Sequence, residues 1–304
     1  MPELPEVECV RRTIQPYLVG RKINTVTLHR ADIVQGINTA QALLEGSVID
    51  RLERRGKQLA LISSAADGSC GRCVVIHLGM SGQLRWDTVA GQAKRLPPQF
   101  KRGKTPPGSQ APKDLPPHTH VVWALDGGRM RFTDPRRFGS VKTFDGPAGL
   151  AQSWARLGPD ALTITPGVLC TTLSRTRRPL KAALLDQAII AGLGNIYVDE
   201  LLFAARLSPM LPADRLTPPR THLLVRQMRA ILGKAIEAGG STLRDYANAS
   251  GATGSYQRQH KVYGHSGDRC PRRSCPDRLA GCVIAGRTTV YCPHCQGSEG
   301  SESV

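Results

Sequence analysis

One stretch decides how the second half of the chain is built: residues 184–197 read LLDQAIIAGLGNIY. Two glycines, Gly192 and Gly194, separate segments whose apolar residues recur at helical spacing. Glycine tolerates positive φ angles, so we predict two helices joined by a tight turn, with Asn195 capping the second. The free N–H groups at the start of that helix attract phosphate, although an ordinary helical hairpin explains the same letters.

Helical spacing extends on both sides of this stretch, over Pro179–Ile190, Asn195–Arg206 and Arg220–Ala238. A further helix is predicted from Pro2 to about Gly20, where a proline and two early carboxylates suit a helix start. The intervening part, residues 22–144, has short β-type runs separated by Gly, Asp and Pro, which predicts an antiparallel sandwich or barrel. The runs are INTVTL, SVIDRL, QLALI, CVVIHL, HVVWAL, RMRFT and SVKTF.

The charge balance favours a polyanionic partner. The chain has 41 Lys and Arg against 24 Asp and Glu, a formal net charge of +17. An excess of this size indicates nucleic acid before membrane, although it also improves solubility. Because no apolar run reaches the ~18–20 residues of a membrane span and the acidic start does not resemble a signal peptide, we expect an intracellular protein.

Cysteines near the end of the chain indicate a metal site. Cys270 and Cys275 form a C-x4-C pair, and Cys292 and Cys295 form a C-x2-C pair. In an intracellular protein such pairs are read as metal ligands before disulfides, so we predict one structural Zn²⁺ held by these four thiolates. Cys282 lies between the pairs and is a competing ligand. A second C-x2-C, Cys70 to Cys73, has no partner pair nearby and is predicted to lie in a hairpin loop.

Further motifs follow a family order along nearly the whole chain. The chain opens MPELPEVE and continues with RRGK at 54–57, HLGMSG at 77–82 and DPRRFG at 134–139, before the GLGN turn and the cysteine pairs. This combination closely resembles the formamidopyrimidine-DNA glycosylases. It departs from their pattern in a Pro-rich basic insertion at 94–117, in the widened first cysteine pair, and in His265 where the family commonly has arginine.

The resemblance implies an α+β fold: an N-terminal β-sandwich with an N-terminal helix, a helix–two-turn–helix domain and a C-terminal β-hairpin zinc finger. The expected parts are the catalytic sandwich domain at 1–147, a linker at 148–165, the helical DNA-binding domain at 166–262, the finger at 263–296 and a disordered tail at 297–304.

The resemblance also implies the chemistry. It assigns the Schiff-base nucleophile to the amine of Pro2, which is free only after Met1 is removed, and proton transfer at the sugar to Glu3. An α-amino group titrates near ~8, so a useful fraction is neutral at neutral pH. Glu6 lies one helical turn later and is expected to orient groups or relay protons, although helix-dipole stabilisation explains both carboxylates equally well. Lys57 matches the lysine linked to glycosylase proton transfer, and Arg287 the finger arginine linked to δ-elimination.

An enzyme that acts on a base within a duplex must flip it out and fill the gap. Three residues match the family's intercalating trio: Met80, Arg136 and Phe138. The resemblance also implies that His118, Lys181 and Asn195 contact DNA and that Arg137 binds a backbone phosphate. Arg175 and Arg177 lie in a basic run before Lys181 and are further candidate DNA contacts. Residues 242–254 match a mobile loop that covers the flipped lesion.

The expected function is therefore excision of 8-oxoguanine and formamidopyrimidines from duplex DNA, followed by β,δ-elimination at the resulting abasic site. The expected setting is a monomer in a bacterial cytoplasm, acting on chromosomal DNA. Two alternatives stay open. The sister endonuclease-VIII-like family prefers oxidised pyrimidines, although Leu4 and the complete DPRRFG motif favour the purine branch. A zinc protein that binds lesions without chemistry is the other.

Overall fold

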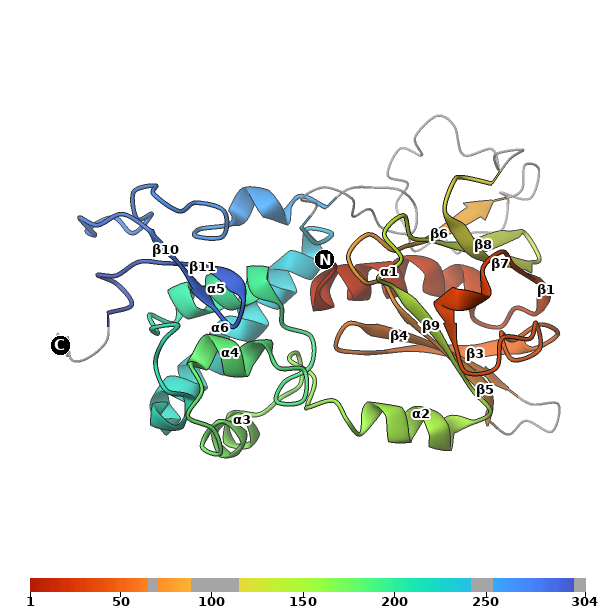
Figure 1. Cartoon of the computed structure of the whole chain (residues 1–304), viewed down its shortest axis with the longest axis horizontal. Coiled ribbons are helices and arrows are strands. Elements are labelled where there is room, and N and C mark those ends of the chain that lie inside the picture. Colours follow the sequence, from red (N-terminus) through yellow and green to blue (C-terminus); the bar gives the residue numbers. More distant parts are fainter. Residues whose placement is uncertain (65–69, 89–114, 242–253, 298–304) are drawn as a thin grey trace. The chain divides into compact units, whose positions relative to one another are not determined.

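The computed structural model describes residues 1–64, 70–88, 115–241 and 254–297 of the chain (Figure 1). The expected insertion at 94–117, except its last three residues, lies outside these ranges, as do residues 242–253 of the expected lesion-covering loop and the tail from residue 298. The chain divides into two compact units: residues 1–155 with 239–255, and residues 156–238 with 256–304. No helix in the described ranges is long and apolar enough to cross a membrane.

Two sheets form the body of the first unit, which confirms the predicted sandwich. The four-stranded sheet has the order β1 (Ile23–Leu28), β7 (Thr119–Leu125), β8 (Gly128–Thr133), β6 (Gln83–Thr88). The five-stranded sheet has the order β2 (Val34–Gln35), β9 (Ser140–Phe144), β5 (Cys70–His77), β4 (Gln58–Ser64), β3 (Val48–Arg55). Every pair is antiparallel except the short β2–β9 pair, which is parallel.

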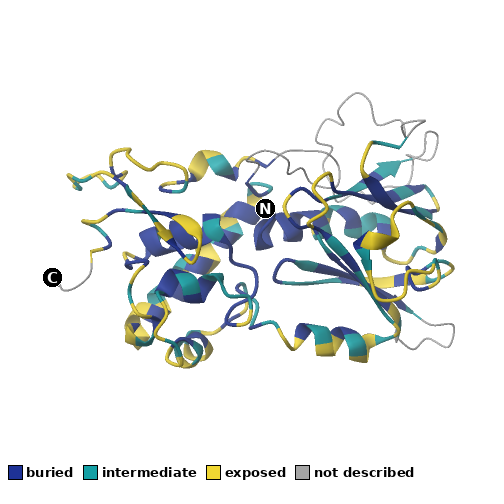
Figure 2. Cartoon of the chain, in the orientation of Figure 1, coloured by how far each residue is buried: buried dark blue, intermediate teal, exposed yellow. Residues whose placement is uncertain are grey.

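Helix α1 (Leu4–Leu18) contacts β3 and β4 of one sheet and β6 of the other. Its apolar residues Leu4, Val7, Ile14 and Leu18 are fully buried, because their spacing brings them to one face of the helix. Figure 2 shows the N-terminal half of the helix in the colour of buried residues. The helix begins two residues later than predicted, so Pro2 precedes the helix and its nitrogen takes no part in helical hydrogen bonding.

The second unit contains the predicted helix pair. Helix α4 (Leu180–Leu185) and helix α5 (Asn195–Ala204) are joined by the glycine-containing turn, in which Gly192 has a φ of 115°. Two details differ from the prediction. Helix α4 ends at Leu185, because the Asp186 carboxylate accepts the N–H of Ala188 and starts a turn. The cap of α5 is Gly194, and Asn195 is the first helical residue.

The unit is completed by two more helices and a hairpin. Helices α3 (Pro166–Leu173) and α6 (Pro218–Glu237) pack against each other, and α6 also packs against α5. Strands β10 (Ala280–Ile284) and β11 (Arg287–Tyr291) form the C-terminal hairpin, with Ala285 and Gly286 at its turn. Both turn residues have positive φ angles, which suit the right-handed twist of a two-residue hairpin.

Three local details differ from the expectations. Helix α2 (Pro147–Trp154) occupies the start of the expected linker, and the Trp154 indole donates to Gln58 on β4. Strands β2 and β6 were not predicted. The prediction for Cys70 and Cys73 was wrong: they lie within strand β5 and not in a hairpin loop, because the strand continues past both of them.

Candidate DNA-processing site

The start of α1 holds two buried carboxylates next to Pro2. Glu3 is the cap of the helix, and its side chain accepts the N–H of Glu6. Glu6 reciprocates: its Oε2 accepts the N–H of Glu3 at 2.8 Å. The other carboxylate oxygen of Glu6 accepts the N–H of Ser241 at 2.7 Å. Glu6 therefore ties the helix start to the residue that directly precedes the segment 242–253.

A Cβ on Gly240 would lie 2.9 Å from Oε1 of Glu6, so a larger residue would push against this carboxylate. Gly240 also has a φ of +84°, which side chains other than glycine rarely adopt. The close approach of this backbone to Glu6 therefore requires glycine at position 240.

Lys57 lies in the tight turn between β3 and β4, where Arg55 pairs with Gln58. Its side chain is buried, whereas a lysine in a turn is normally solvated. The neighbouring Arg54 donates one hydrogen bond to the carbonyl of Gly56, at 2.9 Å, and another to Glu8 on α1, at 3.1 Å. The turn that carries Lys57 is thus attached to the helix that follows Pro2.

Glu8 is the centre of this attachment. Burial raises the pKa of its carboxyl, but hydrogen bonds from Arg11 and Arg12 and the charges of Arg11 and Arg54 lower it to about 2. Glu8 therefore remains ionised at neutral pH and forms ion pairs with the three surrounding guanidinium groups. Sequence reasoning missed this role, because Glu8 and Arg54 are 46 residues apart along the chain.

His77 on β5 is a further group at this site that sequence reasoning did not select. Burial, with the positive charges of Lys57 and Lys142, lowers the pKa of His77. Its Nδ1 accepts the N–H of Gly79 at 3.2 Å, so the proton of the neutral ring lies on Nε2. A neutral donor thus stands in the electrostatic neighbourhood of Lys57. The signal was available, because His77 opens the HLGMSG motif.

The residues proposed to fill the gap lie on two adjoining loops of this unit. Met80, Arg136 and Phe138 are all exposed, and Phe138 has 57% of its surface accessible. The guanidinium of Arg136 lies over the Phe138 ring, 4.9 Å from its centroid. A Cβ on Gly79 would overlap the backbone of Phe138 and Gly139, so the two loops are in direct backbone contact.

Asp134 holds these loops together from inside. Its side chain is completely buried and accepts the Ser81 hydroxyl at 2.6 Å, from the Met80 loop, and the N–H of Gly139 at 2.7 Å. The N–H of Arg136 also points to this group, 3.3 Å from Asp134 Oδ1 and 3.2 Å from Ser81 Oγ. One carboxylate therefore sets the relative position of both exposed loops.

Two further predicted DNA contacts of this unit, His118 and Arg137, are both exposed. His118 is exposed and has a φ of 63°, which is uncommon for a residue with a side chain. Arg137 also has a positive φ, of 56°, and its guanidinium is 3.5 Å from Asp32. Asp32 also binds Arg30, and hydrogen bonding from Arg30 is the main cause that lowers its pKa. Arg137 is therefore oriented by a surface acid and remains open to solvent.

In the second unit, Arg175, Arg177 and Arg287 are exposed, as direct contact with a phosphate requires. Lys181 differs from the expectation of a DNA contact. Its side chain is fully buried and its ammonium lies 2.6 Å from Asp199 Oδ1, so it has no surface to offer a phosphate. Asn195 is half-buried, and its Nδ2 donates to the carbonyl of Thr288 at 2.9 Å.

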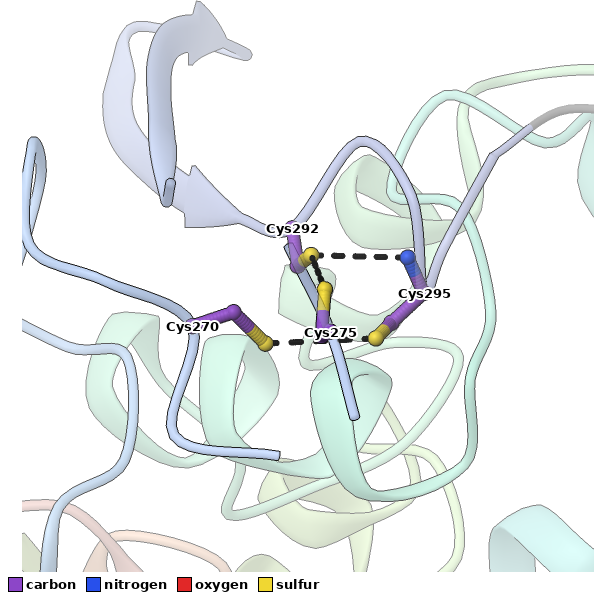
Figure 3. A group of neighbouring side chains, drawn as sticks. All are labelled: Cys270, Cys275, Cys292 and Cys295. Carbon is purple, nitrogen blue, oxygen red and sulfur yellow. Dashed lines mark hydrogen bonds between the residues drawn. The ribbon is translucent and has the colours of Figure 1, made fainter. Parts of the chain in front are cut away.

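The four predicted zinc ligands are close together (Figure 3). Their sulfur atoms all lie within 4.8 Å of one another. A Zn–S distance of about 2.3 Å places the sulfurs of a regular tetrahedron roughly 3.8 Å apart. The Cys270–Cys295 and Cys275–Cys292 separations are 3.9 and 3.5 Å, so the donor set fits one tetrahedral ion. Cys282 lies on β10 opposite Thr289 and is not a member of this group.

Comparison with known proteins shows the family of the chain. Residues 1–141 match the family model for the formamidopyrimidine-DNA glycosylase N-terminal domain, and residues 157–247 match the model for its H2TH domain. A relative named formamidopyrimidine-DNA glycosylase, from Phenylobacterium zucineum, is 40% identical over 301 residues, which cover 97% of this chain and 100% of the relative.

Solved structures are similar over the same extent. The MutM (Fpg) protein of Thermus thermophilus is 37% identical, with a TM-score of 0.78, and the match covers 98% of this chain and 100% of that one. The Lactococcus lactis Fpg mutant T221P, in a complex with DNA that contains Fapy-dG, is 30% identical with a TM-score of 0.78, covering 98% of this chain and 100% of that one. Other Lactococcus complexes contain an abasic site or an oxidised pyrimidine. The chain belongs to the formamidopyrimidine-DNA glycosylase family.

Proposed function

We propose that the chain excises oxidised purines from duplex DNA and then cleaves the strand by β,δ-elimination, with the amine of Pro2 as nucleophile. The observation that carries the proposal is the arrangement at the helix start. Pro2 stands next to two buried carboxylates, Glu3 and Glu6, and the same helix is attached to the turn that carries Lys57. A nucleophile, an acid and a cation are thus held by one network.

In this mechanism the free amine of Pro2 attacks C1′ of the damaged nucleoside. The C1′–N bond breaks, and its electron pair leaves with the base, which takes up a proton. Glu3 is the proposed proton donor to the opening sugar, and Glu6 positions it through the helix cap. The secondary amine forms an iminium that carries a positive charge without further protonation and therefore draws electrons during elimination. The nitrogen is free to react only when Met1 has been removed.

The four-cysteine group is proposed to hold one structural Zn²⁺. When bound, the ion supplies cross-linking of the finger and no chemistry, because four thiolates leave it no open coordination position. The bacterial origin of the relatives supports a place beside bacterial chromosomal DNA. The substrate proposal draws on the Fapy-dG and abasic-site complexes of the Lactococcus relative.

Borohydride trapping on an 8-oxoguanine:C duplex, followed by mass spectrometry of the N-terminus, tests the proposal. We expect a covalent adduct at Pro2 of a chain that lacks Met1. A chain that binds the duplex and forms no adduct would be a lesion-binding protein without lyase chemistry. A second substrate class is worth testing, because one Lactococcus complex contains an oxidised pyrimidine. Faster excision from thymine-glycol:A than from 8-oxoguanine:C would favour that class.

The loop brace around Asp134 leads to a first prediction. Asp134→Asn replaces an oxygen that accepts the Gly139 N–H, or the one that accepts Ser81, with an amide nitrogen that cannot accept. Leaving a buried donor without its acceptor costs about 1–3 kcal/mol. We expect about a tenfold or larger loss of 8-oxoguanine excision from duplex DNA, measured under single-turnover conditions.

The loss is expected to be smaller on a single-stranded abasic substrate, which requires no base flipping. Ser81→Ala removes one donor from the same carboxylate and should give a weaker effect of the same kind. If Asp134→Asn slows both substrates equally, Asp134 serves general stability and not the intercalating loops.

The charge balance leads to a second prediction. Each phosphate that the protein neutralises contributes about −0.9 to the slope of log K against log salt concentration. With a net charge of +17, we expect duplex binding to weaken steeply between about 50 and 200 mM salt. Fluorescence anisotropy with a labelled duplex measures the slope. A flat response would mean that the basic residues do not contact phosphates.

A further inference from the structure

Two buried charges in the second unit end on the backbone of strand β11. The Lys181 ammonium, on α4, lies 2.6 Å from Asp199 Oδ1 and donates to the carbonyl of Thr288 at 3.0 Å. Asp199, on α5, uses its other oxygen to accept the N–H of Val290 at 3.1 Å. Both side chains are at most 1% exposed. Together with the Asn195 amide, which also donates to Thr288, they connect two helices to one strand.

The register of the hairpin explains why these backbone groups are available. In an antiparallel pair, successive residues alternate between bonding to the partner strand and facing outward. Arg287 pairs with Ile284 next to the turn, so residues 287, 289 and 291 face β10. Thr288 and Val290 therefore direct their N–H and C=O groups to the open edge of the hairpin. Lys181 and Asp199 bind this edge as a neighbouring strand would.

The four cysteines hold the other end of the hairpin. Cys292 directly follows β11, whereas Arg287 is the first residue of the strand after the turn. Five residues of strand span about 16 Å. A metal ion at the cysteines would therefore cross-link one end of the hairpin and leave the turn end about that far away. A two-stranded hairpin is only marginally stable alone. The turn end therefore needs a second attachment, and the ion pair lies next to it.

A buried ion pair is a poor way to gain stability, because removing two charges from water offsets much of their attraction. We therefore explain the buried ion pair by the geometry that it imposes on strand β11. A pair that binds backbone groups at two alternate positions of one strand fixes both the register and the direction of that strand. Arg287 is exposed and directly precedes Thr288, so the contacts that fix Thr288 also fix the backbone position of Arg287.

We propose that Lys181 and Asp199 are positioning residues that hold the turn end of the β10–β11 hairpin so that Arg287 reaches the phosphate released in the second elimination. The inference rests on the proposed function. In that step a base takes the C4′ proton, and the electrons of the C4′–H bond enter the conjugated iminium and then return to form a C4′–C5′ double bond. The C5′–O5′ bond breaks with its electron pair going to the phosphate, which remains as a 3′-phosphate end. A guanidinium at that phosphate stabilises the departing negative charge.

The test is the ratio of δ- to β-elimination products from a duplex that contains an abasic site, separated on a denaturing gel. Asp199→Asn keeps the shape of the side chain and removes the charge, and Lys181→Met removes the ammonium. We expect both variants to lower the δ rate about 10- to 100-fold relative to β, because a misplacement of about 1 Å costs on the order of a hundredfold. Borohydride trapping should stay within about twofold of the unaltered chain.

Arg272→Met is the matched control. Arg272 is another cation that joins the finger to α5: it donates to the carbonyl of Phe203 at 2.7 Å and lies over the Phe203 ring. It is attached at the cysteine end of the finger and not at the turn. We expect this variant to lower thermal stability and leave the δ:β ratio unchanged. Combining Asp199→Asn with Arg287→Ala should give no further loss beyond Arg287→Ala alone.

An unchanged δ:β ratio in Asp199→Asn and Lys181→Met would overturn the inference, as would an equal fall of trapping and both eliminations. A ratio that falls equally in Arg272→Met would also overturn it, because general loosening of the finger would then suffice. If the unaltered chain gives no trapping and neither elimination product, the proposed function itself is wrong. This outcome differs from a failure of the inference, in which the unaltered chain is active.

Discussion

A Pro2→Gly variant of the processed chain is expected to form covalent adduct with abasic DNA at least about a hundredfold more slowly. Glycine retains an α-amine but loses the two features that suit the proline. Its primary amine gives an imine that must hold a proton to act as an electron sink. Its backbone is also free to rotate, so the amine is no longer oriented, and misplaced reactive groups cost on the order of a hundredfold. The rate of borohydride trapping under single-turnover conditions measures the effect.

Binding to a duplex that contains tetrahydrofuran, which has no aldehyde to react, should remain within about twofold, because Pro2 precedes the helix and makes none of its hydrogen bonds. Pro16→Gly is the matched control, since it makes the same change inside α1 and leaves the amine intact. Chemical acetylation of the Pro2 nitrogen should abolish trapping. Equal loss of trapping and tetrahydrofuran binding in Pro2→Gly would mean that Pro2 is structural.

The fold was largely predictable from patterns that are local. Alternating runs predicted seven of the strands, and the GLGN turn predicted the helix pair. Two strands were missed: β2 has only two residues, and β6 reads QLRWDT, in which charged Arg85 and Asp87 alternate with buried Leu84 and Trp86. Charged residues are uncommon in a strand unless partners exist, and here Arg131 on the neighbouring strand β8 binds Asp87. Helices α2 and α3, of eight residues each, lie in the expected linker and directly after it, and they were not predicted either.

The candidate site was less predictable wherever a residue depends on distant partners. The resemblance to the family implied that Lys181 contacts DNA. Its burial follows from Asp199, which lies 18 residues away on another helix. Lys57 is buried in a turn that Arg54 attaches to Glu8. Ser81 and Asp134 both belong to recognised motifs, yet only the folded sheets bring them together.

The cysteine group leads to the last prediction. Cys292→Ser is expected to abolish zinc binding and unfold the finger. The apolar cluster at the ligands is small: it contains Cys270 and Cys292 themselves, with Phe203, Val262, Leu279 and Val290. A core of this size cannot offset the entropy of ordering the segment, so the finger depends on metal binding, worth roughly 10–16 kcal/mol in comparable peptides. We expect less than about a tenth of the zinc content of the unaltered chain, measured by mass spectrometry of the metal.

The functional consequence follows from the position of Arg287. Without the finger the hairpin loses its base, so δ-elimination should stop while the Pro2 adduct still forms at a reduced rate. Limited proteolysis should cleave the Cys292→Ser chain near residues 263–296 and spare the rest. Cys282→Ser is the control, because Cys282 lies on β10 outside the four-sulfur group and its loss should leave one zinc per chain. Retention of zinc in Cys292→Ser together with its loss in Cys282→Ser would show that the ligands are assigned wrongly.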